Sequence, residues 1–365
     1  MDKRQGFRRL AGAVLLIGGV ALLVAQLPGE FWAQLGQKAA LAAVSLQQAD
    51  DAAALLSEKL TRLPAGADGG TNDLPLDGQW AGAEQQPMTE PTATQSNAAV
   101  SVPPKDGTGG KVIEQVVAGG SEIAGLQVKN KSGVTVDLPA ALKAPLPFDI
   151  EVGSPDPQVL IYHTHTTEGY MPYDAGYYND GDVRREPSYP HNVTLVGDAI
   201  EAELTAAGIT VLHVTEIYDH PNYRGSYERS VKMMEEMLKT YPSIKVTLDI
   251  HRDGLMANST DKLKPTVTVN GQKAAQMMVV CGVLDTDALP HPNWRQNLSF
   301  AAKLQEALAA DYGNLMRPLS LVGARYNQYL TAGSLLLEVG SEGNTVEEAI
   351  YSGHLLGQTL AELFT

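Results

Sequence analysis

Two hydrophobic periods alternate through the second half of the chain. Short apolar runs of strand length, such as Val159-Leu160-Ile161-Tyr162, are separated by stretches whose apolar residues recur at helical spacing. The runs predict strands at 158–163, 209–214, 244–250, 318–322 and 334–339, and the stretches predict helices at about 193–207, 226–240, 294–311 and 345–362. Strands that alternate with helices indicate an α/β domain with a mixed, largely parallel sheet flanked by helices.

Two further segments predict β structure. Residues 264–283 look like two strands joined at Asn270-Gly271, which is a strong hairpin-turn signal. Apolar runs at 112–113, 126–128 and 134–136 indicate a small β element whose place the pattern does not fix. We therefore assign residues 111–150 to a small β-rich lead-in and residues 151–365 to the main domain.

The N-terminus has a different pattern. Four Lys and Arg residues within residues 1–9 precede a nearly uncharged run from 10 to 27, about the length of a helix that crosses a bilayer. Because Lys and Arg cluster on the cytoplasmic side, residues 1–9 are predicted to be a cytoplasmic tail, with the rest of the chain outside. The alternative is a cleavable signal peptide, but the run is long for a signal and its small-residue cleavage pattern is weak. We expect an uncleaved, single-pass transmembrane anchor in the cell membrane.

Two segments connect this anchor to the folded part. Residues 28–63 carry apolar positions at helical spacing and predict a juxtamembrane helical stalk, with a docking helix for another membrane protein as the alternative. Residues 64–110 are rich in Gly, Pro, Ala, Ser and Thr and hold few large apolar residues. Such a segment cannot bury enough surface to offset the entropy of folding, so we predict a disordered linker.

Composition narrows the choice of function. A net charge of -15 argues against a nucleic-acid partner. The single cysteine, Cys281, excludes an intrachain disulfide and lies in an apolar run, which is typical of a small buried side chain.

Side chains that can bind metal or move protons follow three of the predicted strands. His165 and Glu168 follow one strand, His251 ends a second, and Glu338 ends a third. In open α/β sheets the carboxyl edge is where active sites are built. Two His and one Glu are a known ligand set for catalytic zinc, and the remaining Glu can act as the base that takes a proton from water. The pattern predicts a zinc hydrolase.

The residues alone leave the third ligand open. Glu168 lies three positions after His165 and can reach the same ion. His163 alternates with His165 along the strand, so it is either a ligand or a group that supports one from the core. His191, at the start of a predicted helix, is a further candidate, although a surface or capping role fits it equally well.

Two charged residues have competing interpretations. Arg252 can orient a substrate carboxylate or stabilise an oxyanion, or it can form a structural salt bridge, for example to Asp249. Glu338 at the end of a buried strand needs a function or a partner, since a buried carboxylate is costly; a structural ion pair is the alternative to a base. Tyrosines crowd the loop beside the site and are either a binding wall or loop packing: Tyr162, Tyr170, Tyr173, Tyr177 and Tyr178.

At these residues the chain resembles the stage II sporulation protein P family. Several long motifs occur in the same order, which makes the match specific, and a single N-terminal anchor with a linker agrees with it. The matching segments are 160–168, 192–197, 249–253, 291–297 and 326–341.

The resemblance implies a zinc-dependent peptidoglycan hydrolase with a fold similar to the zinc N-acetylmuramoyl-L-alanine amidases. The family cuts the amide between the lactyl group of the glycan and the stem peptide, and it is also credited with endopeptidase cleavage of crosslinks. It acts in septal wall thinning and engulfment at the sporulation septum, with stage II sporulation proteins D and M.

Carried over to this sequence, the resemblance implies zinc ligation by His165, Glu168 and His251 and base catalysis by Glu338. Typical amidases take their glutamate from a later helix, which corresponds to the region of His191 here, so the third ligand stays open. Two other functions compete: a zinc carboxypeptidase that trims stem peptides, and a non-catalytic wall-binding scaffold on the same fold.

Overall fold

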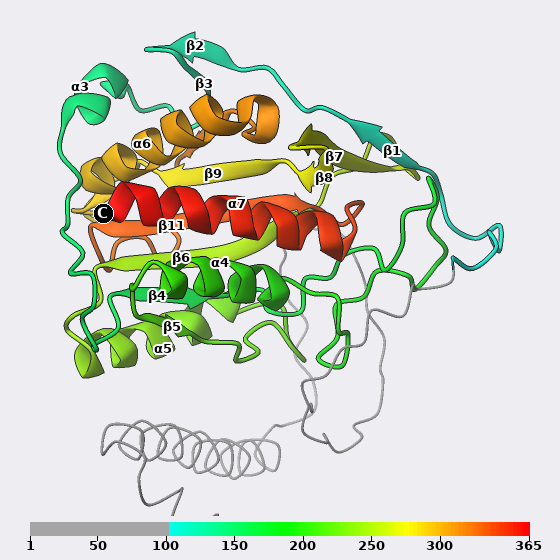
Figure 1. Ribbon diagram of the computed structural model, residues 1–365, viewed down its shortest axis with the longest axis horizontal. Coiled ribbons are helices and arrows are strands. Elements are labelled where there is room, and N and C mark those ends of the chain that lie inside the picture. Colours follow the sequence, from blue (N-terminus) through cyan, green and yellow to red (C-terminus); the bar gives the residue numbers. More distant parts are fainter. Residues whose placement is uncertain (1–101) are drawn as a thin grey trace, which may run out of the picture. The chain divides into compact units, whose positions relative to one another are not determined.

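An eight-stranded mixed sheet lies at the centre of the computed structural model, which describes residues 102–365 (Figure 1). In spatial order its strands are β2 (Ser121–Ile123), β3 (Leu126–Asn130), β10 (Leu319–Val322), β9 (Met277–Gly282), β11 (Gly333–Ser341), β6 (Val246–Asp253), β4 (Val159–Tyr162) and β5 (Val211–His213). Most neighbours are parallel; β9 pairs antiparallel with β11, and β2 pairs antiparallel with β3. The expected mixed α/β fold is confirmed.

Helices cover both faces of this sheet, unequally. The long helices α4 (Thr194–Ala206), α6 (Trp294–Tyr312) and α7 (Val346–Phe364) lie on one face, in front of the sheet in Figure 1. Helix α5 (Ser226–Thr240) packs on the other face, beside β4 and β5. Alternate strand residues separate accordingly, because successive side chains point to opposite faces. Ile161 joins the core under α4, whereas Leu160 packs against Met234 of α5.

A hairpin joins two strands of a smaller sheet. The small sheet contains β1 (Val112–Gln115), β7 (Lys262–Val269) and β8 (Gln272–Ala275). Asn270 and Gly271 join β7 to β8 with φ of 50° and 83°, the positive values that a type I′ turn requires, so the predicted hairpin is confirmed. The sequence pattern predicts a single strand after this turn. The structure divides it at Gln276 into β8 and β9, which belong to different sheets.

The segment before residue 150 takes part in both sheets. Strand β1 pairs with β7, and β3 pairs in parallel with β10, so Leu126 and Val128 belong to the main core. Residues 134–136, where β structure is expected, contain no strand. They lead instead into the short helix α3 (Leu138–Lys143), whose N-cap Asp137 accepts a hydrogen bond from Ala140 N at 3.0 Å.

Helix α7 begins at a capping box directly after the turn that follows β11. Thr345 Oγ1 accepts from Glu348 N at 3.3 Å, and the Glu348 carboxylate accepts from Thr345 N at 3.2 Å. This cap fixes how the chain leaves β11, the strand that carries Glu338. Cys281 of β9 is fully buried in the core beneath the helices, as expected, and burial raises the pKa of its thiol to about 12.

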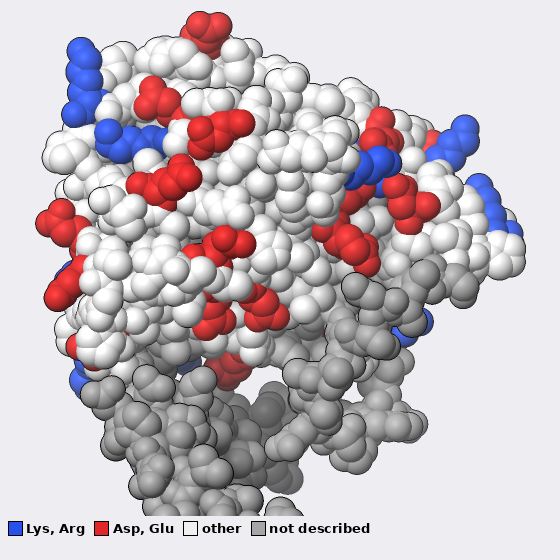
Figure 2. All heavy atoms as spheres, in the orientation of Figure 1, with Lys and Arg blue, Asp and Glu red and all other residues white. Residues whose placement is uncertain are grey.

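Acidic side chains predominate over basic ones on the face that carries α4, α6 and α7 (Figure 2). Within residues 102–365, no helix is both long enough and apolar enough to span a bilayer. The predicted cytoplasmic tail, anchor, stalk and most of the predicted linker fall outside the described residues.

Candidate metal centre

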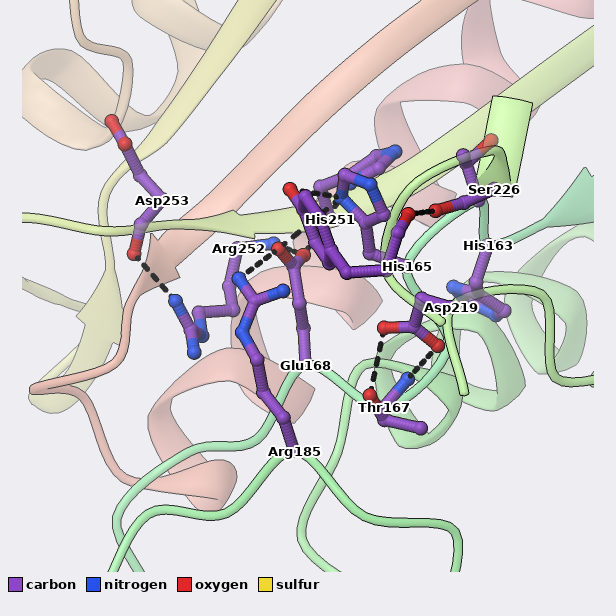
Figure 3. A network of polar contacts seen from close by, with 12 residues as sticks. His163, His165, Thr167, Glu168, Arg185, Asp219, Ser226, His251, Arg252 and Asp253 are labelled. Atoms are coloured by element: carbon purple, nitrogen blue, oxygen red, sulfur yellow. Dashed lines mark hydrogen bonds and ion pairs between the residues drawn. The ribbon is translucent and has the colours of Figure 1, made fainter. Parts of the chain in front are cut away.

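Three of the candidate side chains meet at the carboxyl ends of β4 and β6 (Figure 3). Nδ1 of His165 lies 3.5 Å from Oε1 of Glu168, and Nδ1 of His251 lies 3.4 Å from Oε2 of the same carboxylate. All three side chains are buried. The structure thus brings together His165 and Glu168 with a histidine more than eighty positions further along the chain.

A tight turn after β4 presents the first two of these side chains. Glu168 N donates to His165 O at 3.0 Å, which closes the turn and places both side chains on one side of it. The two threonines between them are anchored: Thr166 Oγ1 donates to His163 O at 2.9 Å, and Thr167 Oγ1 donates to Asp219 at 2.7 Å. The spacing of His165 and Glu168 is therefore set by backbone geometry.

The separations between these atoms suit a zinc ion. Nitrogen and oxygen ligands about 2.0–2.1 Å from a tetrahedral zinc lie about 3.4 Å from one another. The two imidazole nitrogens lie 3.5 Å and 3.4 Å from different oxygens of Glu168, and one ligand atom from each of the three residues lies within 4.8 Å of the others. Two imidazole nitrogens and one carboxylate leave a fourth position open, which is the donor set of a catalytic site. The residues present therefore fit zinc.

Asp249 supports His251 from the side away from this group. Its Oδ1 lies 2.9 Å from Nε2 of His251, and the carboxylate also accepts from Thr164 N at 2.8 Å and from Thr164 Oγ1 at 2.7 Å. The contact is an ion-pair distance without the alignment of a hydrogen bond, and a carboxylate so close to the far nitrogen still favours a proton there and leaves Nδ1 for a metal.

The field at the site favours positive charge. Burial alone would lower the pKa of His251, but Asp249 and Glu168 outweigh it and hold that pKa well above its usual value. Burial alone would raise the pKa of Glu168, but its contacts with His165 and His251 hold it well below the usual value. Both shifts mean that the negative carboxylates and positive charge on His251 stabilise each other at this site.

Glu338 lies beside His251 on the neighbouring strand. The two residues are register partners between β11 and β6, so their side chains point to the same face of the sheet. Oε2 of Glu338 is buried and has no hydrogen-bond partner among the described residues. Burial raises the pKa of Glu338 to about 8, with His251 opposing this shift and Glu168 adding to it. A carboxylate with a free oxygen and a raised pKa is suited to accept a proton from water.

Loop residues that the sequence pattern did not single out complete the surroundings. Arg185 Nη2 lies 2.9 Å from Oε1 of Glu168, and its guanidinium lies 5.1 Å from the centre of the Tyr223 ring. The Tyr223 ring is stacked on His165 with centroids 4.4 Å apart. Arg185 follows β4 and Tyr223 follows β5, and the carboxyl ends of these two strands share the edge that carries the site. Their positions after these strands could have identified them as candidates from the sequence.

The tyrosines singled out in the sequence contribute less to the site. Tyr162 and Tyr170 are buried, and the Tyr170 hydroxyl donates to Val339 O at 2.9 Å. Tyr178 donates to Thr260 O at 2.6 Å, away from the three ligands. For these residues the contacts favour packing over a binding wall, whereas Tyr223 and Tyr227 contact His165 directly.

The alternative ligands His163 and His191 lie outside the group. His163 uses both ring nitrogens elsewhere: Nδ1 lies 2.9 Å from Ile250 O, and Nε2 lies 2.8 Å from Nε2 of His213. The ring of His191 packs 5.5 Å from that of Tyr189. Neither belongs to the three side chains whose ligand atoms converge within 4.8 Å.

A chain of hydrogen bonds links helix α4 to the strand that carries His251. A carbonyl oxygen only accepts, so His163 Nδ1 donates to Ile250, and burial keeps His163 neutral by lowering its pKa to about 3. His163 Nε2 therefore accepts a hydrogen bond from Nε2 of His213 at 2.8 Å. Burial alone would lower the pKa of His213, but Asp198 and Glu201 of α4, 3.1 Å and 3.6 Å from its Nδ1, raise it.

Arg252 is held by the protein itself. Its Nε donates to Gly169 O at 3.0 Å, and its Nη2 lies 3.7 Å from Glu342. The alternative of a structural salt bridge is confirmed with Glu342 as the partner, whereas the suggested partner Asp249 contacts His251 and Thr164 instead. The Arg252 backbone N–H, donating to Glu168 Oε2 at 2.9 Å, supports a candidate ligand. A role for its guanidinium in substrate binding or oxyanion stabilisation stays a prediction.

Comparisons with known proteins agree on one family. A family model described as stage II sporulation protein P matches residues 81–361. Stage II sporulation protein P of Bacillus subtilis strain 168 is 30% identical over 217 residues, which cover 56% of this chain and 51% of the relative. The chain thus spans about half the length of the curated relative it matches.

Solved structures of amidases are also similar to this chain. The N-acetylmuramyl-L-alanine amidase Ami1 from Mycobacterium smegmatis is 12% identical, with a TM-score of 0.34, and the match covers 59% of this chain and 99% of that one. An N-acetylmuramoyl-L-alanine amidase from Clostridium difficile 630 is 13% identical, with a TM-score of 0.33, and the match covers 57% of this chain and 95% of that one. The sequence match to residues 81–361 covers most of the chain and every residue of the metal centre, and the chain belongs to the stage II sporulation protein P family.

Proposed function

We propose that this chain is a zinc-dependent peptidoglycan hydrolase of sporulation that cleaves the muramoyl-L-alanine amide. The observation that carries the proposal is the group of His165, Glu168 and His251, whose ligand atoms lie within 4.8 Å of one another, with Glu338 beside His251. Membership of the sporulation family supports the cell wall as substrate. Endopeptidase cleavage of crosslinks belongs to the same proposal as a second activity.

Each side chain of the centre has a defined task in this reaction. When bound by the two histidines and Glu168, zinc supplies a Lewis acid that polarises the scissile carbonyl and makes water more acidic. Glu338 takes the proton from the attacking water and passes it to the leaving amine. Asp249 keeps the ring of His251 in the tautomer and orientation that ligation needs.

The proposal extends to where the enzyme works. The basic residues within 1–9 and the apolar run 10–27 support an anchor in the cell membrane with the hydrolase domain outside, at the sporulation septum. Stage II sporulation proteins D and M are the partners that family membership suggests. A linker over 64–110 would let the domain reach wall near its anchor.

The first test is product analysis. Full-length protein is incubated with purified peptidoglycan, with zinc and after removal of metal by a chelator, and the soluble products are identified by mass spectrometry. Zinc-dependent release of stem peptides that lack muramic acid is the expected result. Release of single D-Ala would instead identify a carboxypeptidase. No release with zinc bound, also in the presence of protein D, would identify a wall-binding scaffold.

A substitution at the base tests the chemistry. Glu338→Gln should retain zinc but lower turnover about 10²–10⁴-fold, because the amide cannot accept the proton from water. Glu347→Gln is the matched control: this carboxylate is exposed in the first turn of α7 and should leave turnover within a few-fold of wild type. Near-normal turnover of Glu338→Gln would rule this residue out as the base.

A further inference from the structure

A cavity of about 360 Å³ opens near the metal centre, on the side of the sheet toward β3. Strands β3, β10, β9 and β6 contribute its floor, and Val117, Ala118 and Gly120 contribute its wall. The lining residues that matter for its chemistry are Lys129, Lys131, Asp253, Met278, Arg317 and Ser320.

Strand alternation places this cavity on the same face as the metal centre. Ile250 of β6, Val279 of β9 and Leu319 of β10 belong to the core beneath the helices. Their neighbours in each strand, His251, Met278 and Ser320, therefore point to the opposite face. Met278 is also the register partner of Glu338, so the proposed base and the cavity floor are adjacent.

The cavity carries positive charge that the protein does not fully use. Arg317 is only 6% exposed, and its guanidinium contacts one carboxylate, with Nη2 2.8 Å from Asp253. Its Nε and Nη1 are buried and have no hydrogen-bond partner among the described residues. Lys129 and Lys131 are exposed near it and form no ion pair with any described residue. Unfilled donors of a buried guanidinium are costly, and an anionic ligand would fill them.

The wall of the cavity is built to stay in place. Val117 N donates to Gln276 Oε1 at 2.6 Å, and Gln276 Nε2 donates back to Val117 O at 3.3 Å. Gly120, with φ of 87°, packs so closely on β3 that a Cβ would lie 2.6 Å from Val128 O. The segment that closes the cavity is thus fixed to strands on both sides.

We propose that this cavity binds a carboxylate of the acidic peptide arm of the substrate. The proposal rests on the proposed function, since the peptide side of a muramoyl peptide carries free carboxylates. Arginine binds carboxylates through paired donors, and the two lysines add charge at the rim. Acidic side chains predominate over basic ones on the helix-covered face (Figure 2), so an acidic ligand is repelled there, while Arg317 and the two lysines attract it to the cavity.

Binding can be measured apart from hydrolysis. Full-length protein carrying Glu338→Gln and loaded with zinc is titrated calorimetrically with N-acetylmuramoyl-L-alanyl-D-glutamyl-diaminopimelate, and with the same compound amidated at its peptide carboxylates. The free acid should bind about tenfold more tightly. The double substitution Lys129→Gln/Lys131→Gln should remove most of this preference, and Lys239→Gln, which removes a charge on α5, should retain it.

Arg317 is tested by a conservative change, because its removal risks the fold. Arg317→Lys keeps the charge opposite Asp253 but loses the paired donors, so it should weaken the preference for the free acid several-fold. Equal binding of the two compounds, or a preference untouched by the double lysine substitution, would overturn the subsite. If the wild-type protein hydrolyses the wall but binds both compounds equally, the proposed function stands and the subsite is wrong. If it prefers the free acid but does not hydrolyse the wall, the subsite stands and the proposed function is wrong.

Discussion

At the residue scale, each candidate ligand is held by a further side chain. Asp249 contacts His251, Arg185 contacts Glu168, and Tyr223 stacks on His165. Such supporting contacts fix ring orientation and tautomer before a metal arrives. The supports should therefore control metal affinity although they do not touch the metal themselves.

Asp249→Asn tests this idea for His251. The amide is the same size but carries no charge, so it should hold the imidazole less firmly and lower zinc affinity about 10–100-fold. Competition with a chelating dye measures the affinity, and thermal unfolding of the metal-free protein checks the fold, because Asp249 also accepts from Thr164. Asp156→Asn, at an exposed position, is the control. Unchanged zinc affinity would show that Asp249 does not support His251 as a ligand.

His291 gives a prediction on pH that does not involve the metal centre. It is 0% exposed just before α6, and burial lowers its pKa to about 4, with Asp285 opposing and Arg325 adding to this shift. In the unfolded chain the pKa is about 6.5, so between these values the unfolded state binds more protons and stability falls as pH falls. The loss on going from pH 7.5 to 5 should be about 2 kcal/mol.

Urea unfolding of wild type and His291→Gln at both pH values measures this contribution. The variant should lose less stability on acidification than wild type, by about that 2 kcal/mol, whatever its stability at pH 7.5. Parallel losses in the two proteins would show that His291 does not resist protonation in the folded state.

At the element scale, regular periodicity made several helices predictable. Helix α5 covers 226–240 as predicted, and α6 ends at Tyr312, one residue beyond the prediction. Strand β6 departs more: the apolar run ends at Ile250, but pairing with β11 continues to Asp253. Polar residues end the hydrophobic pattern without ending the strand, because a site on the sheet needs polar side chains where a core strand would have apolar ones.

Contacts between distant segments were harder to predict. The convergence of His165 and His251 follows from parallel strands that share a carboxyl edge. The pairing of β3 with β10 joins segments about 190 positions apart, and nothing in either short run encodes that partner. The places of Arg185 and Tyr223 depend on loop conformations that periodicity does not describe.

The crossing of α4 and α7 depends on glycine. A Cβ on Gly353 would lie 2.9 Å from Val196 O and 3.1 Å from the Ala199 Cβ of α4. Ala usually stabilises a helix by up to about 1 kcal/mol relative to Gly, but here the helices would have to separate, at a cost of about 1–3 kcal/mol. Gly353→Ala should therefore lower the free energy of unfolding, and Glu362→Ala, at an exposed site of the same helix, should change it by less than about 0.5 kcal/mol. A stabilised Gly353→Ala protein would show that a Cβ fits between α4 and α7 without moving the helices apart.

At the scale of the whole molecule, chemistry and charge are divided between the two faces of one sheet. Acidic side chains predominate over basic ones on the helix-covered face (Figure 2), and the opposite face carries the metal centre and the cavity lined by Arg317 and two lysines. A net charge of -15 repels other acidic polymers at long range, so local positive charge on one face determines how an acidic substrate is oriented. The proposed membrane anchor would also limit how far from the membrane the hydrolase domain can reach.

The folded part of the chain begins well before residue 151, where the sequence pattern placed the start of the main domain. Residues 111–150 supply β3 to the edge of β10 and bury Leu126, Val128 and Leu138, which are 4%, 2% and 0% exposed. Burial of each such side chain contributes about 1.5–3 kcal/mol, so their loss rivals the 5–15 kcal/mol of a typical domain. Removal of β3 also leaves β10 as an unpaired edge, a template for aggregation.

A chain that begins at 151 should therefore fail to fold, whereas one that begins at 102 should unfold cooperatively at the same urea concentration as the full-length protein. Near-ultraviolet circular dichroism and urea titration distinguish these outcomes, because a chain without packed tertiary structure loses both the near-ultraviolet signal and the sharp transition. Cooperative unfolding of 151–365 with an unchanged midpoint would mean that β3 and the segment around it are an accessory to a core that is complete without them. In that case the cavity lined by Lys129 would be lost without loss of the metal centre, and the shorter chain would itself become the control that separates peptide binding from hydrolysis.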